Sequence, residues 1–168
     1  MKSKLTAEKI IAFLDLHPHP EGGYYSRTYQ ADEQISIRDL PERYSGSRAY
    51  STAIYYLLTA DTCSRLHRID SDEVFHFYLG DPVRMVHLFP DGAGRCMTLG
   101  TDLLAGMRPQ IIVPRGVWQG AHLADGGTFA LLGCTVAPGF DFEDFELGNR
   151  ETLIETYPQF SKDINALT

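Results

Sequence analysis

Short runs of residues with high β-propensity, separated by turn residues, fill most of this chain. The runs are rich in Tyr, Val, Ile, Phe and Thr, and their spacing is typical of an all-β sandwich or barrel. Pro90-Asp91-Gly92 is the clearest hairpin turn between two of them. Strands are predicted near residues 23–30, 49–59, 64–69, 73–79, 83–89, 95–100, 109–113, 117–123, 128–137 and 140–147. The chain is therefore constrained to a strand-dominated fold.

Helical patterns occur only near the two ends of the chain. Thr6 is a suitable N-cap for a segment in which apolar residues recur at helical spacing, and a polar, acidic segment near the C-terminus also fits a helix. A second short helix is expected after Pro158. No linker or repeat divides the 168 residues. We predict a single domain over residues 1–168, with a short helix at about 7–16, a barrel at about 23–147 and a closing helix at about 149–157.

Charge and composition narrow the class of partner. The net charge is −7 and the basic residues are scattered, which argues against a nucleic-acid binder. The longest apolar run, residues 53–58, is too short to span a membrane. The three cysteines are far apart and show no Cys-x-x-Cys spacing, which favours a reducing compartment. We expect a cytoplasmic protein whose partner is a small molecule.

The segment from Leu66 to Gly80 carries the candidate site. Side chains alternate across a strand, so the odd-numbered residues are expected to share one face, namely His67, Ile69, Glu73, Phe75, Phe77 and Leu79. His76 and Tyr78 should then point the other way. A carboxylate in an apolar strand is costly unless it is paired. We therefore expect Glu73 to have a partner nearby, with His67, Arg65 and Gln119 as candidates.

Two segments of the chain resemble the sequence motifs of the cupin superfamily. His67, followed by Glu73 after six residues and Gly80 after seven more, resembles the first motif, and the turn at 114–116 followed by Gln119 resembles the second. The resemblance implies metal ligands at positions 67, 69, 73 and 119. Ile69 cannot coordinate a metal and Gln119 is a weak ligand, while His122 has the wrong parity to substitute. No metal is predicted; if one is present, His67, Glu73 and Gln119 would hold it.

The rest of the chain narrows this resemblance to one branch. The segments 17–25 (HPHPEGGYY), 51–58 (STAIYYLL) and 138–147 (PGFDFEDFEL) are similar to signatures of a cupin family catalogued as a domain of unknown function. The resemblance implies a jelly-roll, double-stranded β-helix and a homodimer. It also implies architectural similarity to the cupin-type sugar-nucleotide epimerases. The reaction must still be argued from the site.

Several other residues keep two interpretations. Glu21, beside two glycines, either belongs to a simple turn or reaches the rim of a pocket. One residue of each pair Tyr24-Tyr25 and Tyr55-Tyr56 should face inward and could donate a proton. Four apolar residues of the last predicted strand are expected in the core rather than in a ligand platform, namely Phe140, Phe142, Phe145 and Leu147. The acids between them are expected on a solvated or interface-facing edge, namely Asp141, Glu143, Asp144 and Glu146.

The leading hypothesis is a metal-independent cupin that catalyses an isomerase- or epimerase-type proton transfer on a sugar or similar polar metabolite. His67 would be the base, Glu73 would orient it, an inward Tyr would return a proton and Gln119 would polarise a carbonyl. Further ligand-binding residues are expected around them, namely Phe75, Phe77, Ile69, Arg65 and Glu21. One alternative is an enzyme that depends on one divalent metal ion, and another is a non-catalytic binding module.

Overall fold

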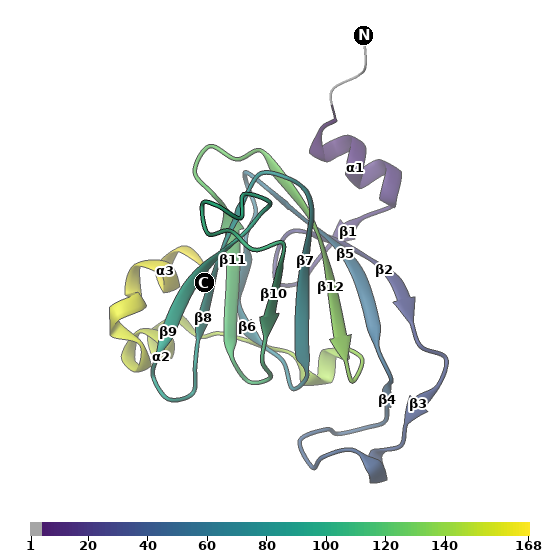
Figure 1. Ribbon diagram of the computed structural model, residues 1–168. Coiled ribbons are helices and arrows are strands. Elements are labelled where there is room, and N and C mark those ends of the chain that lie inside the picture. Colours follow the sequence, from purple (N-terminus) through teal and green to yellow (C-terminus); the bar gives the residue numbers. More distant parts are fainter. Residues whose placement is uncertain (1–4) are drawn as a thin grey trace.

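The computed structural model describes residues 5–168 and consists of two antiparallel sheets that face each other, with short helices at both ends of the chain (Figure 1). The six-stranded sheet has the order β1 (His17–Pro18), β2 (Tyr24–Gln30), β5 (Thr52–Thr59), β12 (Phe129–Ala137), β7 (Asp72–Gly80) and β10 (Gln110–Val113). The five-stranded sheet has the order β13 (Glu146–Leu147), β6 (Ser64–Arg68), β11 (Trp118–Leu123), β8 (Val83–Leu88) and β9 (Gly94–Leu99). These two layers confirm the all-β prediction.

The remaining elements lie outside the two sheets. β3 (Gln34–Ile35) and β4 (Arg48–Ala49) pair as an arm that extends from the six-stranded sheet (Figure 1). The helices are α1 (Ala7–Leu14), α2 (Arg150–Thr156) and α3 (Ser161–Ala166), with 3₁₀ turns η1 (Ile37–Asp39), η2 (Phe142–Asp144) and η3 (Pro158–Phe160). None of the helices in residues 5–168 is long and apolar enough to cross a membrane.

The helices cover the outer faces of the two sheets. α1 begins at Thr6, whose hydroxyl accepts the N–H of Lys9, and packs Ile10 against Leu57 and Leu131 of the six-stranded sheet. α2 and α3 lie on the five-stranded sheet, where Ile164 joins a cluster with Leu66 and Val86. The predicted terminal helices are thereby confirmed, because each has an apolar side to bury.

Two strand predictions need correction. The predicted strand 140–147 is wrong over most of its length, because the Asp141 carboxylate accepts the N–H of Glu143 at 2.9 Å and caps η2 instead. Only Glu146–Leu147 pairs with β6. The predicted strand 49–59 is divided into β4 and β5.

A β-bulge in β7 breaks the predicted alternation. Leu131 of β12 pairs with Leu79, whereas Leu132 pairs with Phe77, so Tyr78 is the extra residue. Leu79 therefore shares the face of Leu131, which packs against α1, and the prediction that it faces inward is wrong. His76 does point outward, where it lies beside Thr135 and Gln110.

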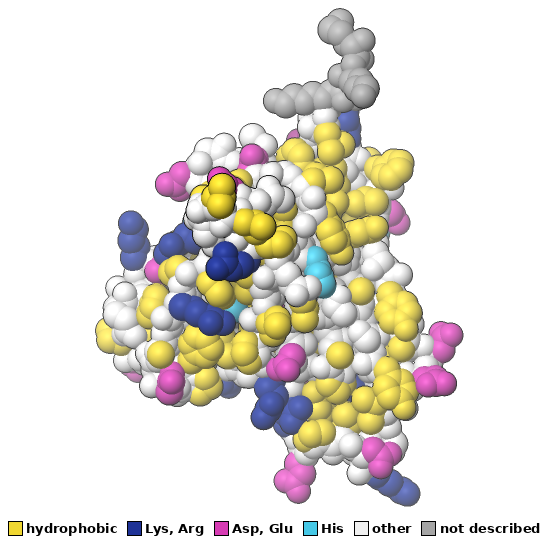
Figure 2. Space-filling model, viewed as in Figure 1, with side chains coloured by type: hydrophobic (Ala, Val, Ile, Leu, Met, Phe, Trp, Pro, Cys, Tyr) yellow, Lys and Arg dark blue, Asp and Glu magenta, His cyan; other side chains and the backbone are white. Residues whose placement is uncertain are grey.

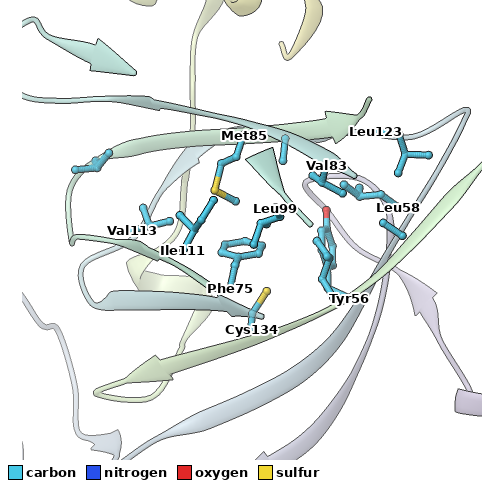
Figure 3. Packing of buried hydrophobic residues seen from close by; sticks show 14 residues of the cluster. Tyr56, Leu58, Phe75, Val83, Met85, Leu99, Ile111, Val113, Leu123 and Cys134 are labelled. Carbon is cyan, nitrogen blue, oxygen red and sulfur yellow. The ribbon is translucent and has the colours of Figure 1, made fainter. Parts of the chain in front are cut away.

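The space between the sheets has an apolar end and a polar end. Phe75 lies in the middle of the apolar cluster, among Ile111, Leu99 and Cys134 (Figure 3). Across the inner face of the five-stranded sheet, His67, Gln119 and His87 are consecutive cross-strand partners. A polar row therefore lies inside the barrel next to a complete hydrophobic core, and this row positions the candidate site.

Candidate functional site

A cavity of about 40 Å³ lies between the two sheets at the polar end of the interior. Its titratable lining comes from five strands and the loop before β2, and consists of His19, Glu21, Tyr25, Arg27, Tyr56, His67, Glu73 and Cys134. A buried water needs roughly 10–15 Å³ of such space. The cavity therefore has room for a few water molecules or for the reacting end of a small molecule.

His67 is held by both of its ring nitrogens. Nδ1 lies 2.8 Å from the backbone carbonyl oxygen of Arg65, and a carbonyl only accepts, so Nδ1 carries a proton. Nε2 lies 3.2 Å from Oε2 of Glu21, and both groups are buried. A bare imidazole nitrogen and a bare carboxylate would repel each other, so a proton lies between them. Both ring nitrogens of His67 therefore face an acceptor, which is the arrangement that binds an imidazolium beside a carboxylate.

The Glu21 carboxylate is the centre of a polar cluster. Its Oε1 accepts the hydroxyl of Ser64 at 2.7 Å, and its Oε2 lies 3.5 Å from Nδ1 of His19. The pKa of His19 is lowered, first by burial and partly by the nearby His67, against the raising effect of Glu21. A neutral His19 therefore lies on one side of the carboxylate and the charged His67 on the other.

Backbone geometry explains why Glu21 reaches the cavity. Gly22 and Gly23 both have positive φ, 113° and 69°, and a Cβ on Gly22 would collide with the carbonyl oxygen of Cys63. Arg65 fixes the same loop from outside, because its guanidinium donates to the carbonyl oxygens of Pro20 and Glu21 at 2.5 and 3.3 Å. The turn and its arginine brace together place the carboxylate beside His67.

Glu73 is a second buried carboxyl in the cavity. The Gln119 amide donates to its Oε2 at 2.5 Å, so one of the partners expected from the sequence is present. Burial raises the pKa of Glu73 to about 7; the charge of His67 opposes that rise and the charge of Glu21 adds to it. Glu73 can therefore exchange a proton near neutral pH, which suits a general acid or base.

The structure decides which tyrosines face inward. Tyr25 and Tyr56 line the cavity, whereas Tyr24 and Tyr55 pack on the outer face near α1. The Tyr56 hydroxyl donates to the carbonyl oxygen of Gly22 at 2.7 Å, and burial raises its pKa well above the ordinary value. Tyr25, whose ring meets that of His19 edge-on at 4.6 Å, is the other inward tyrosine and lines the cavity.

An aromatic wall closes the cavity on the side of η2. Phe140 and Phe142 line the cavity with ring centroids 5.0 Å apart. η2 is tied to the β3–β4 arm by Arg48, which donates to both oxygens of Asp144 at 2.8 and 2.6 Å. Asp144 is thus buried in an ion pair, and the prediction that it lies on a solvated or interface-facing edge is wrong.

The other predicted ligand-binding residues have different places. Ile69 lines the cavity. Phe75 and Phe77 belong to the apolar cluster, and Gln119 is buried behind Glu73. Arg65 has the parity of His67 but is exposed, because a bulge in β6 turns it outward. The structure therefore brings together His67, Glu73, Glu21 and Ile69, and leaves the other four outside the cavity.

Sequence reasoning missed His19 and Ser64. His19 precedes Pro20, which favours an extended backbone at that position and was a usable signal for its fixed direction. Ser64 faces inward together with His67 despite the opposite parity, because Gln119 pairs with His67 while Ala121 pairs with Ser64. No pattern of alternation reveals such a bulge.

The described side chains do not fit a metal ion. Within residues 5–168, no group of three or more His, Cys, Asp or Glu side chains is arranged to hold one. Gln119 turns its amide nitrogen, which is not a ligand, toward Glu73. His122 lies outside the cavity lining, with Nδ1 on the carbonyl oxygen of Leu123.

Three proteins are similar to this chain in sequence, and two of them have solved structures with a similar fold. An uncharacterized protein from Saccharomyces cerevisiae is 31% identical over 146 residues, which cover 82% of this chain and 72% of the relative. The solved structure of a hypothetical protein from Leishmania major is 33% identical with a TM-score of 0.87, and the match covers 98% of this chain and 99% of that one. Protein SO0799 from Shewanella oneidensis is 34% identical with a TM-score of 0.88, over 98% of both chains.

A more distant likeness concerns the fold alone. Oxalate decarboxylase from Bacillus subtilis is 15% identical with a TM-score of 0.53, and the match covers 92% of this chain and 37% of that enzyme.

The family model described as cupin superfamily (DUF985) matches residues 8–148. This chain belongs to that family of the cupin superfamily.

Proposed function

We propose that this protein binds a small polar metabolite in the cavity and catalyses an isomerase- or epimerase-type proton transfer without a metal ion. The observation that supports this most strongly is the convergence of His67, Glu21 and Glu73 in one small enclosed space. Two carboxyls with different environments beside one histidine can serve as acid and base at the same pH.

The protonation states of Glu73 and His67 assign their roles in the proposed reaction. Above pH 7 the Glu73 carboxylate is ionised and can accept a proton from a carbon next to a carbonyl. The proton between His67 Nε2 and Glu21 can pass to the carbonyl oxygen, and the O–H group formed there then donates to these two acceptors in its place. The product of this step is an enol with Glu73 protonated and His67 neutral. Return of the proton from Glu73 to carbon, with the enol O–H proton passing back to His67, completes the isomerisation and restores the starting charges. If Tyr25 protonates the carbon instead, the proton on Glu73 must afterwards pass to the Tyr25 phenolate to restore them.

The hypothesis differs from the sequence-based one in two roles. Gln119 is assigned to orient Glu73 rather than to touch substrate, because it lies behind that carboxyl. Glu21 rather than Glu73 supports His67, because it contacts Nε2 directly at 3.2 Å. The substrate class retains the sequence-based expectation of a sugar or similar polar metabolite.

Hydrogen exchange into substrate carbon tests this function. Wild-type protein is incubated in D₂O with a panel of aldoses, ketoses and 2-hydroxyketones, each in neutral, carboxylated and phosphorylated forms, and deuterium incorporation at carbon is followed by NMR. We expect exchange with at least one compound, lowered about 10²- to 10⁴-fold in His67→Gln and Glu73→Gln. His76→Gln is the control, because His76 lies on the outer face of β7.

Three outcomes contradict this function. Exchange that survives in His67→Gln at the wild-type rate removes His67 from the chemistry. Saturable binding of a compound without any exchange supports a binding module instead of an enzyme. Stoichiometric metal in the purified protein that is lost in His67→Ala supports a metal-dependent site.

The proposal also includes a homodimer. Ile112 of β10 and Tyr78 of β7 are 55% and 51% exposed. Figure 2 shows mostly white surface with a histidine and single hydrophobic side chains over β7, β10 and β12, and we assign this outer face to the contact with a second copy. Native mass spectrometry at micromolar concentration checks the assembly, and a monomer would contradict it.

A further inference from the structure

A second cavity of about 180 Å³ adjoins the first. The two share four lining residues, namely Arg27, Thr52, Phe140 and Phe142. The second cavity is the larger and reaches toward the β3–β4 arm, where Gln34 and Ser47 line it. A ligand whose reacting end fills the inner cavity would therefore place its remaining atoms between Arg27 and Phe142.

Arg27 is the cation at this junction. Its Nη1 donates to Oε1 of Gln30 at 2.6 Å, a neutral partner, and no carboxylate in residues 5–168 pairs with it. The other arginine of the second cavity, Arg48, is already neutralised by Asp144. Arg27 thus offers an uncompensated charge and several free N–H groups to a ligand.

The neighbours of Arg27 add donors rather than acceptors. The carbonyl of Gln30 is used by Arg27, which leaves its amide N–H groups to donate. The buried Thr52 hydroxyl accepts the N–H of Phe140 at 2.9 Å, and Ser47 accepts the N–H of Ile37 at 3.2 Å, so both O–H groups can donate outward. The carboxylate in the lining, Asp141, is engaged by the N–H of Glu143.

We propose that the ligand carries an oxyanion, a carboxylate or a phosphate, that binds Arg27, Gln30 and Thr52 in the second cavity while its reacting end lies at His67. This inference rests on the proposed function only for the position of the reacting end. Charge-assisted hydrogen bonds from a guanidinium are among the stronger polar contacts. The substrate class is therefore a small anionic hydroxy- or oxo-compound rather than a neutral sugar.

Anion titration followed by NMR tests the site. Sodium acetate and inorganic phosphate are the probes, at constant ionic strength, and the signals are the Arg27 Nε–Hε group and the backbone amides of Thr52 and Phe140. We expect saturable shifts in wild-type protein and in the control Arg38→Gln, because Arg38 is exposed on the arm outside the second-cavity lining. Binding in Arg27→Gln, read from the Thr52 and Phe140 amides, should weaken at least tenfold, with Arg27→Lys intermediate.

The outcomes separate this inference from the proposed function. Tighter binding of phosphate supports a phosphate ester as ligand, and tighter binding of acetate supports a carboxylic acid. Equal affinity of Arg27→Gln and wild type, or no saturable shift with either probe, overturns the anion site. His67→Gln should bind the probes as wild type does. If it does and no deuterium exchange is found for any compound, the anion site stands and the proton-transfer function fails.

Discussion

His87 makes the stability of this protein sensitive to acid. Its side chain is fully buried, and neither ring nitrogen has a hydrogen-bond partner within residues 5–168. Burial, and secondarily the charge of Arg95, lowers its pKa from 6.5 to about 4. An unfolded chain therefore takes up a proton on this side chain at a pH where the folded protein does not.

The direction and the magnitude of the acid effect on stability follow from this difference in the pKa of His87 between the folded and the unfolded chain. As pH falls through 6.5 the unfolded state gains the proton and the folded state is destabilised, until the penalty is complete below pH 4. The loss in the free energy of unfolding reaches about 3.4 kcal/mol at low pH, and at pH 5 it is about 2 kcal/mol. Well above pH 6.5, His87 is neutral in both states and this destabilisation is absent.

His87→Met tests the reasoning. Methionine fills the space without a titrating group, and it also removes two unsatisfied polar atoms, which should add about 1–3 kcal/mol of stability even at pH 7.5. Urea unfolding at pH 7.5 and pH 5 measures the free energy of unfolding of both proteins. We expect the advantage of His87→Met to grow by about 2 kcal/mol at pH 5. An advantage that is the same at both pH values would refute the lowered pKa, because all other titrating groups are common to the two proteins.

Three further changes have defined outcomes. Ionised Glu73 destabilises the folded protein increasingly as pH rises from 4.5 to 7, by up to about 3.4 kcal/mol, and Glu73→Gln should remove this loss. Unfolding midpoints of both proteins at pH 5 and pH 8 measure it, and a difference between the two proteins that is the same at both pH values contradicts it. Asp144→Asn should lower the free energy of unfolding by about 1.5–3 kcal/mol, because Arg48 loses its two short charged hydrogen bonds and retains the longer charged contact with Glu143 at 3.5 Å; a loss under 1 kcal/mol in urea unfolding contradicts it. Tyr56→Phe should cost about 1 kcal/mol by the same assay, since it loses the hydrogen bond to Gly22; a more stable variant contradicts it.

The regular part of the fold could be predicted from the sequence. Alternation on β7 correctly places Glu73 and Phe75 inside and His76 outside, because side-chain direction on a regular strand depends only on residue parity. The prediction fails at Leu79 and Arg65, since each lies beyond a bulge whose position depends on pairing with another strand.

The site was only partly visible in the sequence. His67 and Glu73 lie on strands and follow a pattern, but Glu21 lies in a loop whose direction depends on two glycines with positive φ and on the brace from Arg65. Contacts across 46 residues between Gln119 and Glu73 leave no local signal either. Residues that converge from separate elements require the packed structure.

The protonation state of His67 is the most direct test of the account. Long-range ¹H–¹⁵N NMR of the histidine side chains reports whether each ring nitrogen carries a proton. We predict that both nitrogens of His67 carry a proton in wild-type protein, because each faces an acceptor oxygen, and that Nε2 loses its proton in Glu21→Gln, while His76 is unchanged. An unprotonated Nε2 in wild-type protein, with the same spectrum in Glu21→Gln, would contradict the shared proton on which the proposed chemistry depends.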